Sequence, residues 1–300
     1  MKQLSVVVLA AGEGKRMRSA HPKVLHPLCG RPMLSYILDS ASALTDQVFI
    51  VIGHGAPLVK ETLGPAWKYI LQEEQLGTGH AVSQALPELP DSGNLLVLCG
   101  DTPLLETRHL QEMLNQHGTG GATVMTARVP DPYGYGRIIR DSRGQVEAII
   151  EESEATGGQK AINEINTGAY CFDLQLLNRF LPKLGENNVQ QEYYLTDVIA
   201  MIKDHGQPVQ AYQLSDYRVG LGVNDRCQLA EAAAIWRQRI NRELMMKGVT
   251  IIDPEATYID FGVEVGPDTV IWPQTVIEGP STIGSRCQIG PGTHLRQAIL

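Results

Sequence analysis

Long apolar runs, paired cysteines and an excess of positive charge are all missing from this sequence of 300 residues. No apolar run reaches the roughly 18 residues of a membrane-spanning helix, and the N-terminus is too short and too lightly charged for a signal peptide. The five cysteines are widely spaced and form no Cys-x-x-Cys motif, which favours buried thiols in a reducing compartment. Together these absences predict a soluble, cytoplasmic protein without a membrane partner.

The balance of charge excludes another class of partner. There are 25 Lys and Arg residues against 33 Asp and Glu residues, which gives 25 − 33 = −8. A chain this acidic is not expected to present a general surface for nucleic acid or for an anionic membrane. An anionic ligand therefore needs a local positive site, and a short loop is the place to look for one.

Glycine is the one outlier in the composition, with 30 of 300 residues against a usual share of about 7%. Up to about residue 210, short apolar runs alternate with amphipathic stretches. The runs Val6–Ala10, Val48–Ile52 and Leu95–Leu98 are continuous, as in parallel strands covered on both faces. The alternation predicts a doubly wound, Rossmann-like α/β domain whose ligand binds at the carboxyl ends of the strands.

Helical spacing is clearest from Leu110 to His117 and from Tyr194 to Ile202. A hairpin is predicted from Ile138–Arg140 and Val146–Ile150, because the sequence between them is typical of a turn. A long helix is predicted from about Asp225 to Lys247, with Asn224 or Asp225 at its start and Gly248 at its end.

Behind this helix the pattern changes to a repeat of six residues. An aliphatic residue recurs at every sixth position, namely at Ile259, Val265, Ile271, Ile277, Ile283, Ile289 and Leu295. This period is typical of a left-handed parallel β-helix, in which each short strand turns one aliphatic side chain inward. The sequence therefore predicts an α/β domain over 1–224, a linker helix over 225–248 and the first coils of a β-helix over 249–300.

The repeat has room for about two coils, whereas such a solenoid needs roughly three or more repeats and a cap. We therefore expect the chain to be a piece of a longer protein.

A glycine-rich segment, Leu9-Ala-Ala-Gly-Glu-Gly-Lys-Arg-Met17, follows the first predicted strand. It is not a Rossmann fingerprint, because Met17 replaces the third glycine, and it is not a Walker A loop, because Arg16 replaces Ser or Thr. Its backbone N–H groups can wrap phosphates, and Lys15, Arg16 and Lys23 add positive charge. A plain strand-to-helix turn explains the glycines equally well.

Two polar residues suit the remaining parts of a nucleotide site. Gln72 offers a donor and an acceptor to a pyrimidine edge, although a polar loop residue is the alternative. Asp101 follows the run Leu95–Leu98 and beside phosphates would be a natural partner for Mg²⁺, unless it caps a helix. His80 has no Cys or carboxylate at ligand spacing, so we interpret it as structural. Polar residues near Tyr135–Arg137, Glu151 and Ile165–Gly168 suit a sugar, although Asn-Thr-Gly is also a turn sequence.

Taken in order, these motifs resemble the bacterial bifunctional N-acetylglucosamine-1-phosphate uridyltransferase/glucosamine-1-phosphate acetyltransferases. Pro22–Leu25, Glu192–Asp197 and Gly222–Asn224 complete the set, and the match covers the whole chain, including the repeat. Two positions depart from the family pattern. Lys15 stands where a small hydroxyl residue is usual, and Cys99 stands where Tyr is frequent.

The resemblance implies transfer of UMP from UTP to N-acetylglucosamine 1-phosphate, with UDP-N-acetylglucosamine and pyrophosphate as products and Mg²⁺ as cofactor. No protein nucleophile is needed, because the sugar phosphate attacks the α-phosphorus in line. A homotrimer is implied as well, and so is acetylation of glucosamine 1-phosphate by acetyl-CoA, at a site beyond Leu300. The alternatives are a pyrophosphorylase for another nucleotide and sugar, or a non-catalytic regulatory module of the same fold.

The resemblance also assigns roles to individual residues. Those implied to contact the nucleotide are Leu9, Ala10, Ala11, Gly12 and Lys23. The uracil is assigned to Gln72, Gly77 and Thr78, and the sugar to Gly136, Glu151 and Asn166. Mg²⁺ is assigned to Asp101 and Asn224, and Asn224 is expected to contact substrate too. Arg16 and Lys23 are expected to stabilise the transition state.

Overall fold

A computed structural model of the chain describes residues 3–118 and 120–300, and it divides into two compact units. The first unit consists of the residues up to Leu25 together with Leu34–Gly222. The second consists of His26–Met33 and Val223–Leu300. The long helix therefore groups with the repeat, and so does a short segment near the N-terminus that no sequence pattern had placed there.

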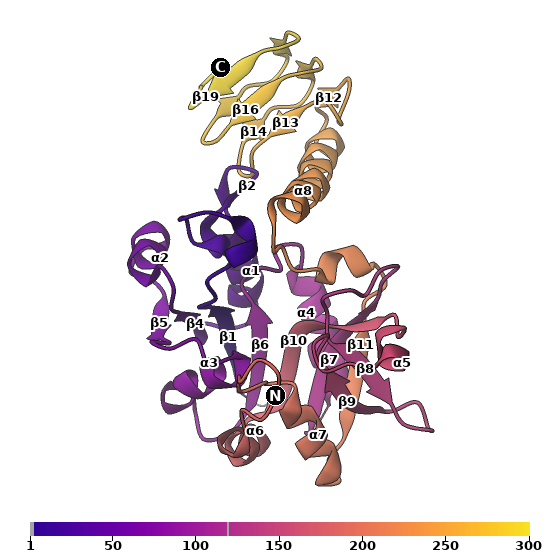
Figure 1. Ribbon diagram of the computed structural model, residues 1–300. Helices are drawn as coiled ribbons and strands as arrows, with labels where there is room; N and C mark the ends of the chain where they lie inside the picture. Colours follow the sequence, from indigo (N-terminus) through magenta and orange to yellow (C-terminus); the bar gives the residue numbers. More distant parts are fainter. Residues whose placement is uncertain (1–2, 119) are drawn as a thin grey trace. The chain divides into compact units, whose positions relative to one another are not determined.

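The first unit is built on a mixed sheet of nine strands (Figure 1). Along the sheet the main strands are β11 (Val209–Gln213), β7 (Ala122–Arg128), β10 (Glu164–Asp173), β6 (Asn94–Cys99), β1 (Leu4–Ala10), β4 (Val48–Ile52) and β5 (Lys68–Leu71). The predicted hairpin is present as β8 (Arg137–Arg140) and β9 (Val146–Ile150), which pair antiparallel. β1 pairs in parallel with both β4 and β6, so the three predicted apolar runs are neighbouring parallel strands.

Four strands of this sheet, β5, β7, β10 and β11, were not predicted. β10 runs antiparallel to both β6 and β7, and its pairing with β7 shifts register between Asn166 and Tyr170. Ile165–Gly168, read from the sequence as a sugar-contact segment or a turn, lies inside this strand, and the irregularity falls at Gly168, whose φ is +81°. A Cβ at Gly168 would approach Cys99 Sγ to 2.7 Å, so the position has no room for a side chain.

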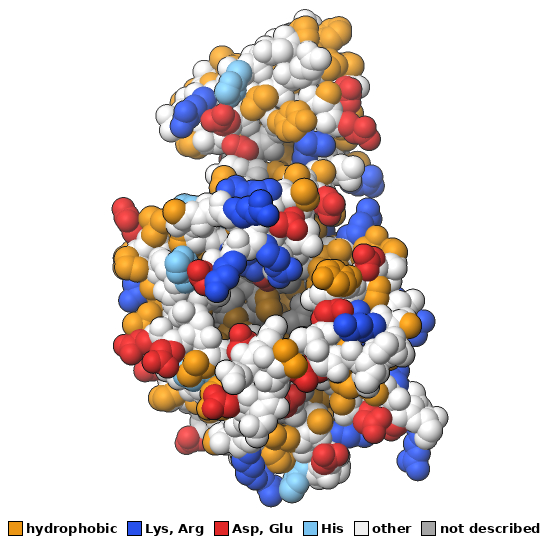
Figure 2. Space-filling view, viewed as in Figure 1, with side chains coloured by type: hydrophobic (Ala, Val, Ile, Leu, Met, Phe, Trp, Pro, Cys, Tyr) orange, Lys and Arg blue, Asp and Glu red, His pale blue; other side chains and the backbone are white. Residues whose placement is uncertain are grey.

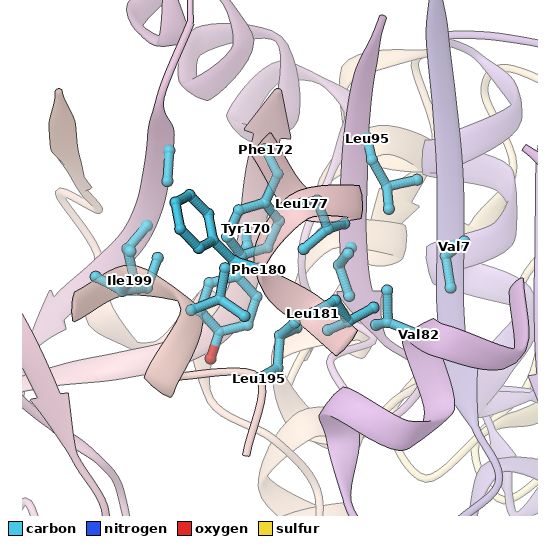
Figure 3. Packing of buried hydrophobic residues seen from close by; sticks show 14 of the residues in the cluster. Val7, Val82, Leu95, Tyr170, Phe172, Leu177, Phe180, Leu181, Leu195 and Ile199 are labelled. Atoms are coloured by element: carbon cyan, nitrogen blue, oxygen red, sulfur yellow. The ribbon is translucent and has the colours of Figure 1, made fainter. Parts of the chain in front are cut away.

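Helices cover both faces of the sheet. The helices and 3₁₀ turns of the first unit are η1 (Lys15–Met17), η2 (Lys23–Leu25), α1 (Met33–Ser42), α2 (Ala56–Leu63), α3 (Thr78–Ala85), η3 (Leu86–Glu88), α4 (Thr107–His117), α5 (Gly157–Lys160), α6 (Leu174–Phe180), η4 (Leu181–Lys183), α7 (Asp197–Asp204) and η5 (Tyr217–Gly220). On one face, α3, α6 and α7 pack against alternate strand residues such as Val7, Leu95 and Phe172 (Figure 3). On the other, His117 of α4 lies 3.0 Å from the Thr123 hydroxyl of β7.

The apolar residues in the middle of β1 and β6 are completely buried. Val6, Val7 and Val8 have no exposed surface, and the same holds for Leu95 to Leu98. Burying one such side chain contributes about 1.5–3 kcal/mol, so uninterrupted apolar runs stabilise strands that are covered on both faces.

The second unit begins with α8 (Arg226–Met246), where the sequence predicted a helix. Asp225 is its N-cap, and the Asp225 side chain accepts a hydrogen bond from the backbone N–H of Gln228. Asn241 is fully buried on this helix and donates its amide to the carbonyls of Pro254 and Thr257, 2.8 and 3.0 Å away. This polar anchor carries no helical or hexapeptide signal, and sequence reasoning missed it.

The repeat forms short parallel strands in three sheets (Figure 1). The strands are β12 (Thr250–Ile251), β13 (Tyr258–Ile259), β14 (Glu264–Val265), β15 (Val270–Ile271), β16 (Val276–Glu278), β17 (Thr282–Ile283), β18 (Gln288–Ile289) and β19 (His294–Arg296). The predicted aliphatic positions are buried, except that Leu295 is half-buried. The coils also begin one strand earlier than the repeat predicts. Ile251 had been missed because eight residues, not six, separate it from Ile259.

The corners of the coils explain a second regularity in the sequence. Asp268, Gln274 and Arg286 each stand three residues after an inward aliphatic residue, and each has φ between +61° and +63°. Gly262 and Gly292 occupy the same place in their turns. The left-handed conformation disfavours most side chains, which explains the two glycines, and three of these five corners carry Asp, Gln or Arg in the same conformation.

The cysteines are free, as expected, but not all of them are buried. Cys171 is buried, Cys29, Cys99 and Cys287 are half-buried, and Cys227 is exposed. Cys227 lies in the first turn of α8, outside the buried side of the helix, so the prediction of buried thiols is wrong for this residue.

Candidate functional site

A cavity of about 260 Å³ lies in the first unit where β1, β5 and β6 end. Parallel strands bring their carboxyl ends to one edge of a sheet, and this is the edge at which open α/β sheets bind ligands. The predicted residues in its lining are Leu9, Ala10, Ala11, Gly12, Lys23, Gln72, Gly77, Thr78 and Asp101. Figure 2 shows a hollow in this face of the unit, with Lys and Arg side chains gathered beside it.

The glycine-rich segment after β1 leads into a single 3₁₀ turn, η1, and not into an α-helix. The alternative reading as a strand-to-helix turn is therefore wrong. Gly14 has φ +66°, and a Cβ on it would lie 2.6 Å from Cβ of Lys23. The glycine thus allows the loop to pass close to Lys23, and the loop contributes Gly12 to the cavity lining. Arg16 is exposed in η1 and is not among the lining residues.

Lys23 and Asp101 form an ion pair in the cavity, with side-chain exposures of 13% and 20%. Each charge neutralises the other, so neither lies uncompensated at a partly buried position. α4 begins only at Thr107, with Glu106 as its N-cap, so Asp101 does not cap a helix. Beside the pair, burial is the main cause that raises the pKa of the Cys99 thiol to about 12. Cys99 is therefore a neutral wall of the cavity.

The donor set at Asp101 fits a metal that arrives with its substrate. No group of three or more His, Cys, Asp or Glu residues that could hold a metal ion occurs within residues 3–118 and 120–300. Mg²⁺ does not need one, because it binds through one or two carboxylates and takes its other oxygens from phosphates and water. Glu192 is a second carboxylate in the lining of the same cavity.

Gln72 follows β5 and is buried, with 3% of its surface exposed. Its amide nitrogen lies 3.2 Å from the Gly77 carbonyl and 3.1 Å from Nδ1 of His80. His80, which we had interpreted as structural, therefore contacts a predicted ligand residue. The only signal in the sequence was its place in the segment Gly77–His80 directly behind Gln72.

A second segment, which contains Tyr193 and Leu195, is hydrogen-bonded to the chain around Gly77–His80. Tyr193 donates its backbone N–H to Leu76 and accepts from the N–H of Gly79, at 2.8 and 2.7 Å. The Thr78 hydroxyl accepts from the N–H of Leu195 at 3.1 Å. α7 begins only at Asp197, three residues after the predicted helical spacing starts at Tyr194, so Glu192–Thr196 is a loop that supports the cavity.

The residues predicted to contact a sugar form a separate cluster. The Asn166 N–H donates to the Gly136 carbonyl at 2.9 Å, and a Cβ on Gly136 would lie 3.3 Å from the Glu151 carboxylate. Glu151 accepts from the Thr196 hydroxyl at 3.1 Å, and burial is the main cause that raises the pKa of this carboxyl group. None of Gly136, Glu151 and Asn166 is among the residues that line the cavity.

The Asn166 side chain is already engaged within β10. Its amide donates to the Tyr170 hydroxyl at 2.5 Å, and its oxygen accepts from the N–H of Gly168 at 3.0 Å. Asn224 belongs to the second unit, where its N–H donates to the Gln228 side chain at 2.7 Å. Gln75, Cys99 and Glu192 line the cavity without having been assigned a role from the sequence.

Residues 6–169 match the family model of the MobA-like NTP transferase domain, and residues 262–297 match the bacterial transferase hexapeptide with six repeats. A solved structure described as a glucose-1-phosphate thymidylyltransferase from Bacillus anthracis in complex with a sucrose aligns with a TM-score of 0.61. It covers 78% of this chain and 95% of that chain at 20% identity, so the likeness shows the fold alone.

Curated proteins match over almost the whole chain. The bifunctional protein GlmU of Geobacillus thermodenitrificans is 51% identical over 294 residues, which are 97% of this chain and 64% of that protein. The GlmU of Shouchella clausii is 47% identical over 298 residues, 98% of this chain and 66% of that protein. The GlmU of Bacillus velezensis is 47% identical over 304 residues, with 100% and 67% covered. The chain thus spans about two thirds of the length of these relatives. None of its described helices combines the length and apolar composition needed to cross a bilayer.

Proposed function

Since the chain belongs to the family of bifunctional GlmU proteins, we propose that it transfers UMP from UTP to N-acetylglucosamine 1-phosphate and releases pyrophosphate. One observation carries the proposal. A glycine-rich loop, the Lys23–Asp101 pair and the buried amide of Gln72 line a single cavity at the ends of parallel strands. These three features suit, in turn, the phosphates, a metal ion and the base of a nucleoside triphosphate.

In the proposed reaction a phosphate oxygen of the sugar phosphate attacks the α-phosphorus of UTP in line, and pyrophosphate leaves. Catalysis then consists of positioning and charge stabilisation, and no side chain forms a covalent bond. The backbone of Leu9–Gly12 binds phosphate oxygens, and the Lys23 ammonium neutralises their charge. Arg16, exposed beside this loop, stabilises the charge that develops on the equatorial and leaving oxygens.

Proteins of this family generally need a divalent metal, and we propose Mg²⁺ held by the carboxylate of Asp101. When bound, the ion neutralises the phosphates and polarises the bonds around the α-phosphorus. Asn224 is proposed as a further oxygen ligand and substrate contact on the strength of the resemblance.

Gln72, Gly77 and Thr78 are proposed to bind the uracil, and Gly136, Glu151 and Asn166 the sugar. The Asn166 amide donates one hydrogen to Tyr170 and accepts one bond from Gly168, so a second hydrogen and a second lone pair remain for the sugar. Thr196 holds Glu151, and its neighbour Leu195 is bonded to Thr78. The proposed sugar and base contacts are thus connected through one short loop.

For the whole protein we propose the second activity that the relatives' name implies, acetylation of glucosamine 1-phosphate by acetyl-CoA, in a homotrimer. We also propose a cytoplasmic location and neither nucleic acid nor membrane as a partner. The hexapeptide coils of the second unit are the part of the acetyltransferase that this chain contains.

The proposal is tested by measuring pyrophosphate release from UTP and N-acetylglucosamine 1-phosphate, with and without Mg²⁺. We expect release that needs both substrates and the metal. Faster release with GTP, ATP or dTTP and another hexose phosphate would favour a different pyrophosphorylase. No release with any pair would favour a regulatory module of the same fold.

A further inference from the structure

The imidazole of His80 lies between the side chains of two glutamines. Its Nδ1 is 3.1 Å from the amide nitrogen of Gln72, and its Nε2 is 3.1 Å from the amide of Gln84, one turn further along α3. Gln72 lines the cavity, whereas Gln84 does not. The ring therefore connects a ligand-facing amide to one that no ligand touches.

The positions of the hydrogens on Gln72 and His80 follow from the Gly77 carbonyl, whose hydrogen-bonding role is fixed. The Gly77 carbonyl can only accept, so the group of Gln72 that lies 3.2 Å from it is the NH₂. The second hydrogen of that NH₂ is directed to Nδ1 of His80, which must accept it and so carries no proton. A neutral imidazole then has its proton on Nε2.

The tautomer of His80 also fixes the orientation of the Gln84 amide. An Nε2–H is a donor, so the amide oxygen of Gln84 must face it, and we assign the two ends of that amide accordingly. The resulting chain runs from the Gly77 carbonyl through Gln72 and His80 to Gln84. In it, both hydrogens of the Gln72 amide and the Nε2–H of His80 each meet an acceptor. No other tautomer of neutral His80 satisfies both Gln72 contacts.

The consequence lies at Gln72. Both hydrogens of its amide are committed inside the protein, so only the oxygen Oε1 remains to bind a ligand. An acceptor pairs with the N3–H of uracil and meets a lone pair at the N3 of cytosine. The two pyrimidines are therefore distinguished by an orientation that Gln72 could not keep on its own, because the two ends of an amide are nearly identical in shape.

We propose that His80 is a positioning residue that makes the site specific for uracil by fixing the orientation of the Gln72 amide. The inference rests on the proposed function, in which Gln72 reads the base. His80 touches no reacting group and acts through Gln72 alone. On the side of the supporting loop its ring faces the ring of Tyr193, with the centroids 6.4 Å apart.

The tautomer is tested first, on the unmodified chain. ¹⁵N-labelled histidine in two-dimensional NMR distinguishes Nε2–H from Nδ1–H imidazoles, and a His80→Asn sample assigns the resonance. We expect the Nε2–H form near pH 8. An Nδ1–H form would overturn the inference without any measurement of activity.

Selectivity is tested by the ratio of kcat/KM for UTP to that for CTP. His80→Leu removes the acceptor, and we expect the ratio to fall about 2- to 12-fold, as for the loss of one neutral hydrogen bond. His80→Asn keeps an amide oxygen near the place of Nδ1, and the ratio should stay within about 2-fold of the parent. Glu88→Gln, exposed in the 3₁₀ turn that follows the same helix, is the control and should leave the ratio unchanged.

A double-mutant cycle separates this inference from the function on which it rests. Gln72→Ala should lower the ratio by roughly 5- to 150-fold, and adding His80→Leu should lower it no further. An unchanged ratio in Gln72→Ala would overturn the proposed role of Gln72, and the inference with it. A reduced ratio in Gln72→Ala together with an unchanged ratio in His80→Leu, or an additive effect of the two changes, would overturn the inference alone. Thermal unfolding of each variant shows whether a change in the ratio reflects loss of the fold.

Discussion

The two units of the chain use polar residues in opposite ways. In the first unit, Lys23, Asp101 and Gln72 gather around a cavity, and their polar atoms are directed at a ligand or at each other. In the second, buried hydroxyls bond to the backbone of the coils. Thr269 donates to the Gly284 carbonyl at 2.8 Å and accepts from the N–H of Cys287 at 3.1 Å, and Thr275 donates to the Trp272 carbonyl at 2.6 Å. The first arrangement is suited to chemistry and the second to stability. Substitutions in the two units should therefore affect different measurements.

The largest difference between an effect on turnover and an effect on stability is expected at Asp101. Asp101→Asn keeps the shape of the side chain but removes the charge that binds Mg²⁺, so turnover should fall by more than about 10³-fold. The melting temperature should fall only modestly, because the change leaves the core intact but removes the carboxylate that neutralises Lys23. Pyrophosphate release and thermal unfolding are measured together, with Asp91→Asn, an exposed carboxylate before the same strand, as the control. Near-normal turnover in Asp101→Asn would exclude the metal site.

Arg16 gives the next effect. Arg16→Ala removes one positive charge beside the phosphate loop and should lower kcat by about 10²–10³-fold. The KM for UTP should change much less, because the backbone of Leu9–Gly12 still binds phosphate. Arg18→Ala, an exposed arginine two residues away, is the control. A loss confined to KM would make Arg16 a binding residue only.

The two units also differ in how far the sequence predicts them. The repeat predicts the inward residues of the second unit because one physical requirement recurs every six positions. It missed Ile251 where two additional residues interrupt the period, and it missed Asn241, whose carbonyl partners lie on a different element. Neither Ile251 nor Asn241 is part of a pattern that can be recognised in the neighbouring sequence.

In the first unit, continuous apolar runs predicted the parallel strands β1, β4 and β6 but not β5, β7 or β11. The antiparallel β10 was hidden because it contains Asn166–Gly168. The cavity lining was predicted largely through the resemblance. The residues that support it, His80, Tyr193 and Thr196, were not predicted, because they act through hydrogen bonds to residues distant along the chain. Sequence reasoning finds the residues that line the cavity more easily than the residues that orient them.

The reverse of the Asp101 result is expected in the β-helix. Ile277 is 1% exposed, and Ile277→Val should lower the stability of the second unit by about 0.5–1.5 kcal/mol. Pyrophosphate release per folded molecule should stay unchanged. Hydrogen exchange of peptides from 250–300 measures the local stability, and Ile299→Val, at a site 87% exposed, is the control. A matching loss of turnover would show that the two units do not divide stability and chemistry between them.

The smallest expected effect is a change in stability at Glu151, a partly buried carboxyl group that we also propose as a sugar contact. Burial raises the pKa of this carboxyl group, so the folded state favours the protonated form more than the unfolded chain does. The favourable contribution is therefore present below the unfolded pKa of about 4.3 and is lost as the pH rises through the folded value. Glu151→Gln stays neutral and can still accept from Thr196, so it should stabilise the protein at pH 8 by about 1 kcal/mol or less and have no such effect near pH 4. Denaturant unfolding at the two pH values measures the difference, and Glu147→Gln, exposed on β9 just before Glu151, should show none. If Glu151→Gln also weakens binding of the sugar phosphate, then the carboxylate that costs stability at neutral pH is retained for its ligand. An equal gain at both pH values would mean that the charge of Glu151 carries no cost in the folded protein.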